Sequence, residues 1–262
     1  MLLPAVPRVH LRAAVQPTID TPFGPLTFTT VIGSTDLPLL PHEQFELPGG
    51  RTVARWTHPA ARVELLLTSY DPELDPENWG PLTDCRAAVW RIDALSPIGR
   101  AQLSARLPTL LPDGAGVGYD GGQALAAITV EDEAFRLTVG GSDEEAICSA
   151  ADKGEVPRRW AALIDEVHDQ SATAWGVDYG DLHGMSWTLP SLKAGEHCEL
   201  PVVAAWAPTT GAEDSANTWY AVMPSPTMLQ RQVTAEPTTR AERLKRAEDR
   251  PVHRRIEGEA TS

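Results

Sequence analysis

Prolines occur along almost the whole chain, and they limit the folds that it can adopt. The protein has 23 prolines among 262 residues, roughly 9% against about 5% in average proteins. A proline inside a helix removes a hydrogen bond and clashes with the preceding turn, and within a sheet it is confined to edges, turns and bulges. The chain is therefore expected to fold into short elements separated by frequent turns.

Strand patterns occupy several of the stretches between prolines. Residues 26–32 alternate between the two faces of a strand. Residues 52–57 and 62–68 flank a short connection, and residues 125–139 contain two alternating runs around an acidic turn. Both pairs predict antiparallel hairpins. Further strands are predicted at 85–92, 185–189, 201–206 and 218–222.

Two helices are predicted inside this β-rich pattern. Ser96-Pro97 has an N-cap residue followed by proline, which is typical of a helix start. A second helix is predicted from Pro157, with Arg159 on its charged, solvent-facing side. Its apolar side has helical spacing and comprises Trp160, Leu163, Ile164 and Val167. Strands and helices do not alternate regularly, so the predicted fold class is α+β, mainly antiparallel sheet built from hairpins with two or three packed helices.

The chain is expected to divide into a globular body and a tail. The body covers residues 1–232. A predicted strand followed by Ser-Pro occurs twice in it, and this weak repeat raises the alternative of two related halves, about 1–112 and 113–232. Residues 233–262 form a polar, basic segment with a single capping box and few apolar residues. We expect this tail to be mobile and partly helical or disordered.

The charge of the protein is strongly negative and unevenly distributed. The net charge is -14, but residues 231–262 contain eight basic and six acidic side chains, which leaves -16 on residues 1–230. A body with this charge repels nucleic acid and anionic membranes. It could attract a basic protein partner, whose association would be sensitive to salt. The alternative is that the negative charge serves solubility alone.

The sequence also predicts the cellular compartment. No apolar run approaches the length of about 18 residues that a membrane span requires. Residues 1–8 lack the order of charges and apolar residues of a signal peptide. The three cysteines are far apart, as expected for reduced thiols, and arginine far outnumbers lysine, as in GC-rich bacterial genomes. We therefore expect a cytoplasmic bacterial protein.

The first candidate site is the acidic loop 71–83. Trp79 lies in this loop without a local apolar pattern that would bury it. An aromatic anchor surrounded by charged residues is a common arrangement at protein interfaces, and the alternative is that Trp79 packs on the core beneath solvated carboxylates. The predicted partner-binding residues are Trp79, Asp71, Glu73, Asp75, Glu77 and Asp84.

The second candidate site is a set of potential zinc ligands. Glycines in residues 175–184 could fold the segment into a tight loop, and two further donors follow before the next predicted strand. Histidine, carboxylate and thiolate suit zinc, although Gly-Asp-rich loops are also ordinary turns. The candidate ligands are Asp178, Asp181, His183, His197 and Cys198.

Catalytic signatures are otherwise weak. Gly116–Gly121 matches the G-x-G-x-x-G string but lacks the preceding strand and following helix of a dinucleotide site. Ser186 lacks the second glycine of a nucleophile elbow. The sequence therefore favours a non-catalytic, acidic protein-binding module without a cofactor, in an immunity-like, antitoxin-like or assembly-accessory role. The alternative is a metal-dependent hydrolase that uses the 178–198 residues.

Overall fold

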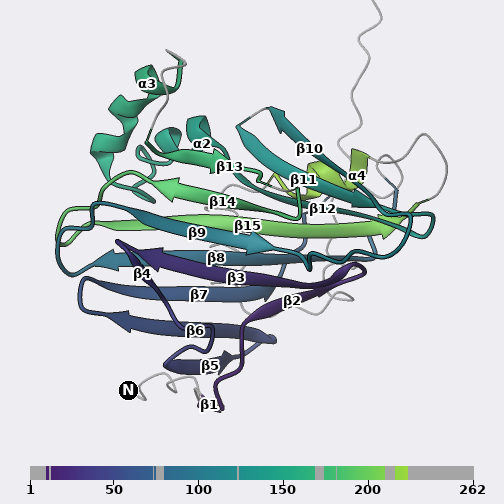
Figure 1. Ribbon diagram of the computed structural model, residues 1–262, viewed down its shortest axis with the longest axis horizontal. Helices are drawn as coiled ribbons and strands as arrows, with labels where there is room; N and C mark the ends of the chain where they lie inside the picture. Colours follow the sequence, from purple (N-terminus) through teal and green to yellow (C-terminus); the bar gives the residue numbers. More distant parts are fainter. Residues whose placement is uncertain are drawn as a thin grey trace, which may run out of the picture.

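The protein forms a sandwich of two antiparallel β-sheets (Figure 1). The computed structural model describes residues 10–11, 13–72, 74, 80–122, 124–168, 174–180, 182–209 and 216–223. Every strand pair in these residues is antiparallel, as expected for strands joined by hairpins and loops.

The larger sheet has nine strands in its described part. Its centre is formed by β8 and β15, which pair over ten positions although they lie more than a hundred residues apart in sequence. In spatial order the strands are β1 (His10–Leu11), β5 (Glu43–Leu47), β6 (Arg51–His58), β7 (Ala61–Ser69), β8 (Asp84–Ala94), β15 (His197–Pro208), β12 (Phe135–Ser142), β11 (Leu125–Glu131) and β10 (Gly116–Gly122).

The smaller sheet covers one face of the larger one. Its central strand β9 pairs with β3 on one side and β14 on the other. In spatial order the strands are β13 (Gly176–Asp178), β14 (Gly184–Leu189), β9 (Ala101–Arg106), β3 (Gly24–Ile32) and β2 (Thr18–Thr21), and β4 (Thr35–Asp36) pairs with the end of β3.

The main core lies between the sheets. Trp90 of β8 contacts Phe28 of β3 edge-to-face, with the ring centroids 5.3 Å apart, and its ring lies 6.2 Å from that of Trp187 of β14. Trp90 and Trp187 are almost completely buried. Aromatic side chains bury large areas and have preferred ring geometries, so these contacts fix one sheet over the other.

Short helices lie outside the two sheets. They are α2 (Glu144–Ser149), the 3-10 helix η1 (Arg158–Leu163), α3 (Ile164–His168) and α4 (Ala216–Ala221). Helix α4 packs on the outer face of the larger sheet, where the Thr138 and Thr218 hydroxyls hydrogen-bond at 2.8 Å. A second, smaller apolar cluster beneath α4 includes Val203, Ala205 and Val222.

The predicted α+β class is wrong, because the fold is a mostly-β sandwich. Strands take up 52% of the described residues and helices 11%. The segment at Ser96-Pro97 leads into β9 instead of a helix, and residues 218–222 lie largely in α4 instead of a strand. Packing of the two sheets against each other supplies the core that the prediction assigned to packed helices.

Local predictions were more successful than the fold class. The hairpins β6–β7 and β11–β12 confirm the predicted pairs, and β3, β8, β14 and β15 form at the predicted segments. The segment after Pro157 is helical with Trp160 fully buried, but its first half is a 3-10 helix. The tail at 233–262 lies outside the described residues, and the division into two halves stays a prediction. In the described part of the chain, no helix has the length and apolar character that crossing a membrane requires.

Candidate functional site

The acidic loop is described only at its ends. Four of the predicted residues lie outside the described part of the chain: Glu73, Asp75, Glu77 and Trp79. The role of Trp79 as an aromatic anchor therefore stays a prediction. Asp71 is exposed. At the other end, Asp84 begins β8, where its carboxylate accepts the N–H of Cys85 and pairs with Arg86 at 2.7 Å.

The predicted zinc ligands lie in two separate places. Asp178 is exposed and accepts the N–H of Gly180, and His183 directly precedes β14. His197 and Cys198 begin β15 beyond the opposite end of β14, and a six-residue strand spans about 20 Å. Asp181 lies outside the described residues. The chain therefore does not bring the four described donors to one point.

The chemistry around Cys198 and His197 also differs from that of a metal site. Burial raises the pKa of the Cys198 thiol, whereas a metal ligand must be a thiolate. His197 Nε2 lies 3.0 Å from the carbonyl oxygen of Gly154. Among the described residues, no three His, Cys, Asp or Glu side chains lie close enough together to hold a metal ion. The hydrolase alternative gains no support from these positions.

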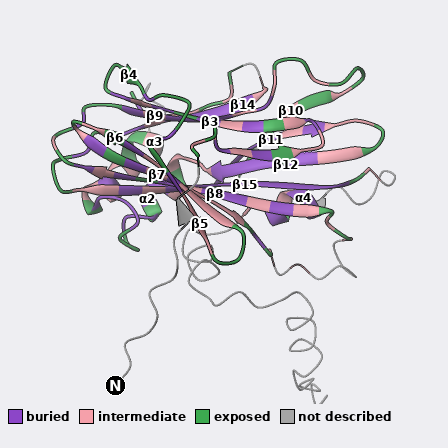
Figure 2. Ribbon diagram, turned by 90° about the horizontal axis from the view of Figure 1, so that it is seen from below, coloured by how far each residue is buried: buried purple, intermediate pink, exposed green. Residues whose placement is uncertain are grey.

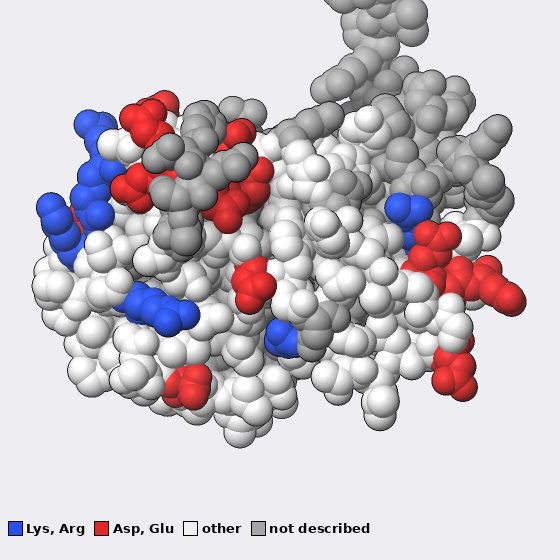
Figure 3. All heavy atoms as spheres, turned by 45° about the horizontal axis from the view of Figure 1, so that its top comes forward, with Lys and Arg blue, Asp and Glu red and all other residues white. Residues whose placement is uncertain are grey.

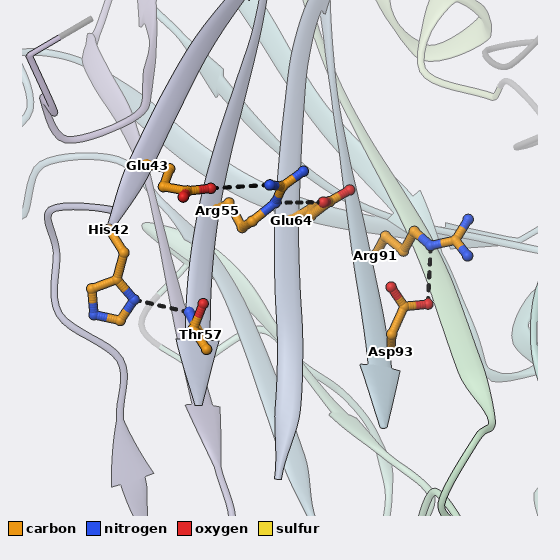
Figure 4. Close-up of polar contacts among 7 residues, drawn as sticks. All are labelled: His42, Glu43, Arg55, Thr57, Glu64, Arg91 and Asp93. Carbon is orange, nitrogen blue, oxygen red and sulfur yellow. Dashed lines mark hydrogen bonds and ion pairs between the residues drawn. The ribbon is translucent and has the colours of Figure 1, made fainter. Parts of the chain in front are cut away.

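A row of alternating charges crosses the outer face of the larger sheet, and Figure 4 shows its members from Glu43 to Arg91. Glu43, Arg55, Glu64, Arg91 and Glu199 occupy successive cross-strand positions on β5, β6, β7, β8 and β15. Three of the ion pairs in this row have N–O distances of 2.8–3.0 Å. Partly exposed pairs of this kind contribute about 0.2–1 kcal/mol each, and the three carboxylates and two guanidinium groups leave the row a net charge of only -1. We therefore assign it to stabilisation of the sheet.

Negative charge also gathers over α2 and α3, as the red side chains at the upper left of Figure 3 show, with basic side chains to their left. The first turns of these helices contain Glu144 and Glu145, and Asp165 and Glu166. The Glu144 carboxylate accepts the N–H of Val177 at 2.7 Å, which ties α2 to strand β13. This acidic surface therefore adjoins the β13 edge of the smaller sheet.

A cavity of about 210 Å³ opens between α2 and α4 on the outer face of the larger sheet. Small residues form much of its lining, including Gly140, Gly141 and Ala150, with Lys153 and Glu155 as its charged members. Pockets that bind drug-sized ligands usually measure about 300–1,000 Å³. The size of this cavity does not by itself indicate a substrate site.

Strand β10 has a different character from the rest of the larger sheet. It stands at the sheet's edge and pairs with β11 over seven positions. Val117 and Tyr119 lie opposite Val130 and Ile128, both fully buried, so their side chains share the inner face of the sheet. Val117 is nevertheless 40% exposed and Tyr119 69% exposed. Figure 2 shows this contrast between β10 and the buried strand β15.

Tyr179 completes this surface from the smaller sheet. It follows β13, and its ring lies 5.3 Å from that of Tyr119. A Cβ on Gly121 of β10 would lie 3.6 Å from the Tyr179 hydroxyl, an ordinary van der Waals contact, so Tyr179 lies directly against this strand. We call the surface formed by Val117, Tyr119 and Tyr179 the β10 shelf. It lies where the edges of the two sheets meet.

Asp84, the last of the predicted partner-binding residues along the chain, lies at the same end of the larger sheet as the β10 shelf. Asp84 and Val117 share one cross-strand line that runs through β15, β12 and β11. Four inter-strand steps of about 4.8 Å place them roughly 19 Å apart. One interface of standard size, about 800 Å² on each partner, can span that distance.

Sequence reasoning missed the shelf because its strand is rich in glycine. The string Gly-Val-Gly-Tyr-Asp-Gly-Gly hides the alternation of Val117 and Tyr119, since glycine gives no apolar or polar signal. By its sequence the segment matches only the string of a nucleotide-binding loop. The usable signal was the placement of an aromatic and a β-branched residue two positions apart, immediately before a predicted hairpin.

Comparison with known proteins leaves the family open. No protein-family model matches the chain, and no curated protein matches it. A solved structure titled "Putative kojibiose phosphorylase from human microbiome" aligns with 90% of this chain and 30% of its own, at a TM-score of 0.42 and 8% identity. A polysaccharide lyase aligns with 73% of this chain and 26% of its own, at a TM-score of 0.32 and 15% identity. The chain thus spans less than a third of either structure, and likenesses this distant establish no shared activity.

Proposed function

We propose that this protein is a non-catalytic, cytoplasmic protein-binding module that contacts a basic partner through the β10 shelf. One observation carries the proposal: Tyr119 is 69% exposed on the inner face of an edge strand, next to the partly exposed Val117. Aromatic residues are enriched at interface hot spots, and exposed apolar surface with a polar rim is typical of interaction sites.

The charge around the shelf supports a basic partner. Asp178 is exposed beside Tyr179, and the acidic surface of α2 adjoins the same edge through the contact between Glu144 and Val177. Asp113 is exposed in the connection that leads into β10. An apolar centre with an acidic rim attracts a basic surface and gives its association a strong salt dependence.

Free thiols support the cytoplasmic part of the proposal. Cys85, Cys148 and Cys198 are unpaired and buried, and proteins of reducing compartments keep their cysteines in this state.

Site-specific cross-linking tests the proposed function. A photoreactive phenylalanine analogue replaces Tyr119 in the full chain, and a matched control carries it at Tyr220, a 37% exposed tyrosine of α4. We expect irradiation in the native host to link a basic protein to position 119 and not to position 220. Equal labelling from both positions, or no product from position 119, would contradict the proposal.

Binding measurements with the identified partner give the quantitative check. Tyr119→Ala should weaken binding by about 2 kcal/mol, as for a hot-spot residue, and leave the midpoint of denaturation nearly unchanged because the side chain is mostly exposed. The affinity of the unmodified protein should fall as salt is raised. An affinity indifferent to both changes would rule out the shelf as the contact.

A further inference from the structure

We propose that the partner binds as an extended basic segment that adds a strand to the free edge of β10. This inference rests on the proposed function and specifies its mode of recognition. In strand addition, backbone hydrogen bonds supply affinity, and the side chains on alternate positions supply specificity.

The edge of β10 is open over a useful length. Among the described strands only β11 pairs with it, and their register is continuous from Gly116 to Gly122. The five residues from Gly116 to Asp120 span about 16 Å. Over these residues one side of β10 presents backbone N–H and C=O groups that no described strand covers.

The sequence of β10 has little of the usual protection of an edge strand. Natural edges are blocked by charged side chains, above all lysine, by proline or by bulges, and the seven residues of β10 include one charged residue, Asp120, and no lysine or proline. Its uninterrupted pairing with β11 also leaves no bulge.

The glycines of β10 favour close approach by another backbone. A Cβ on Gly118 would meet nothing within 4 Å, and one on Gly116 would meet only the Glu131 carbonyl oxygen at 3.8 Å. Glycine inside a strand weakens the strand and often marks a place where another backbone comes near. On the inner face, Val117 and Tyr119 remain available as cross-strand neighbours for an apolar side chain of the added strand.

Charge decides between a basic segment and a second copy of this chain. Residues 113–135 contain no lysine, arginine or histidine, and their acidic residues are Asp113, Asp120, Glu131, Asp132 and Glu133. Arg136 neutralises Glu131 through an ion pair of 3.1 Å, which leaves the other carboxylates in excess. Pairing of two β10 edges would bring these like charges together, whereas lysine or arginine on an added strand would face them favourably.

The test uses a labelled nine-residue peptide, Lys-Val-Lys-Val-Thr-Val-Lys-Val-Lys, and the full chain. Its valines share one face, for the shelf, and its lysines the other. The matched acidic peptide has glutamate in place of every lysine. Two further versions carry N-methyl groups on the odd-numbered or on the even-numbered residues, because only one edge of an added strand needs its N–H groups.

Strand addition predicts a distinctive pattern in fluorescence anisotropy. The basic peptide should bind at least about tenfold more tightly than the acidic one, and one N-methylated version should lose binding while the other retains it. Tyr119→Lys should weaken binding at least about tenfold, since lysine blocks the shelf and the edge. Tyr220→Lys, on α4, should have no effect.

Three outcomes would overturn the inference. They are equal binding of the basic and acidic peptides, the same response to both patterns of N-methylation, and concentration-dependent dimerisation that Tyr119→Lys abolishes. The last would identify a second copy as the occupant of the edge. If the peptides fail while cross-linking at position 119 still identifies a basic protein, strand addition is wrong and the proposed function stands.

Discussion

At the scale of single residues, Arg159 shows how a tertiary contact changes the role of a surface charge. The sequence places it on the solvent-facing side of a helix, but its guanidinium binds both carboxylate oxygens of Glu196, at 3.0 and 2.8 Å. The side chains are 33% and 23% exposed. A two-point contact of this kind contributes more to stability than most surface ion pairs do.

We predict that Arg159→Ala lowers the free energy of unfolding by about 1 kcal/mol at pH 7. The hydrogen bond from Arg159 is the main cause that lowers the pKa of Glu196 below its ordinary value. The stabilisation from this ion pair is therefore complete above the ordinary carboxyl pKa, and it is lost as the pH falls through the lowered pKa of Glu196. Urea titrations at pH 7 and pH 3 should show the difference between the two proteins shrinking at pH 3. A difference that stays constant with pH would mean that the ion pair does not cause it.

Asp143 provides the opposite dependence on pH. It caps α2 by accepting the N–H of Ala146 at 2.8 Å, and burial raises the pKa of its carboxyl. A raised carboxyl pKa means that the folded state binds the proton more tightly, so this group lowers stability as the pH rises through the window between the two pKa values.

Replacing Asp143 by asparagine keeps a good N-cap residue and removes the titrating charge. The stability of Asp143→Asn relative to the original protein should therefore increase as the pH is raised from 3 to 7, as measured by urea titration across this range. Asp143→Ala is the control and should cost about 1 kcal/mol at pH 7 through loss of the cap. A parallel pH dependence of the Asn variant and the original protein would refute the assignment.

At the scale of elements, the distance between the sheets depends on glycines that have no room for a side chain. A Cβ on Gly141 of β12 would lie 2.5 Å from Cζ2 of Trp187 on the opposite sheet. We expect Gly141→Ala to destabilise the fold by about 1–3 kcal/mol, as overpacking of a core does.

Gly118→Ala on β10 is the matched control, since its Cβ would meet nothing within 4 Å. Its effect should stay within about 0.5 kcal/mol, as at other open surface sites. Chemical denaturation of the two variants makes the comparison. Equal effects would show that contact with Trp187 does not set the spacing of the sheets.

The same scale explains which elements could be predicted from sequence. The β6–β7 and β11–β12 hairpins are local, so alternation and turn residues were sufficient. The β8–β15 pair is not local, and nothing in either segment specifies the other. At Ser96-Pro97 the local signals of a helix start were overridden, because the following segment fills the middle of the smaller sheet as β9.

The candidate site was less predictable than the fold for a related reason. The acidic loop was identified from composition, which shows charge but not position, and most of it lies outside the described residues. The β10 shelf depends on the meeting of two sheet edges, one with Tyr119 and one with Tyr179, sixty residues apart in sequence. No local sequence pattern specifies the contact between these two sheet edges. Only the excess of carboxylates over basic groups is evident from the sequence.

At the scale of the whole molecule, the sandwich separates the surface that stabilises the fold from the surface that is available for binding. The outer face of the larger sheet is occupied by the row of paired charges from Glu43 to Glu199 and by α4. The inner face packs against the smaller sheet, and at β10 apolar side chains of this face stay exposed. The net charge of -14 adds long-range attraction for a basic partner.

Amide hydrogen exchange of the full chain, with and without the basic valine-lysine peptide, tests this account most directly. Binding at the shelf predicts slower exchange in residues 116–122, with unchanged exchange in residues 216–223 of the α4 region. The slowing should diminish as salt is raised, because the Debye length falls from about 10 Å at 0.1 M to about 3 Å at 1 M. Unchanged exchange in 116–122 while another surface becomes protected would contradict the assignment of β10 as the binding edge.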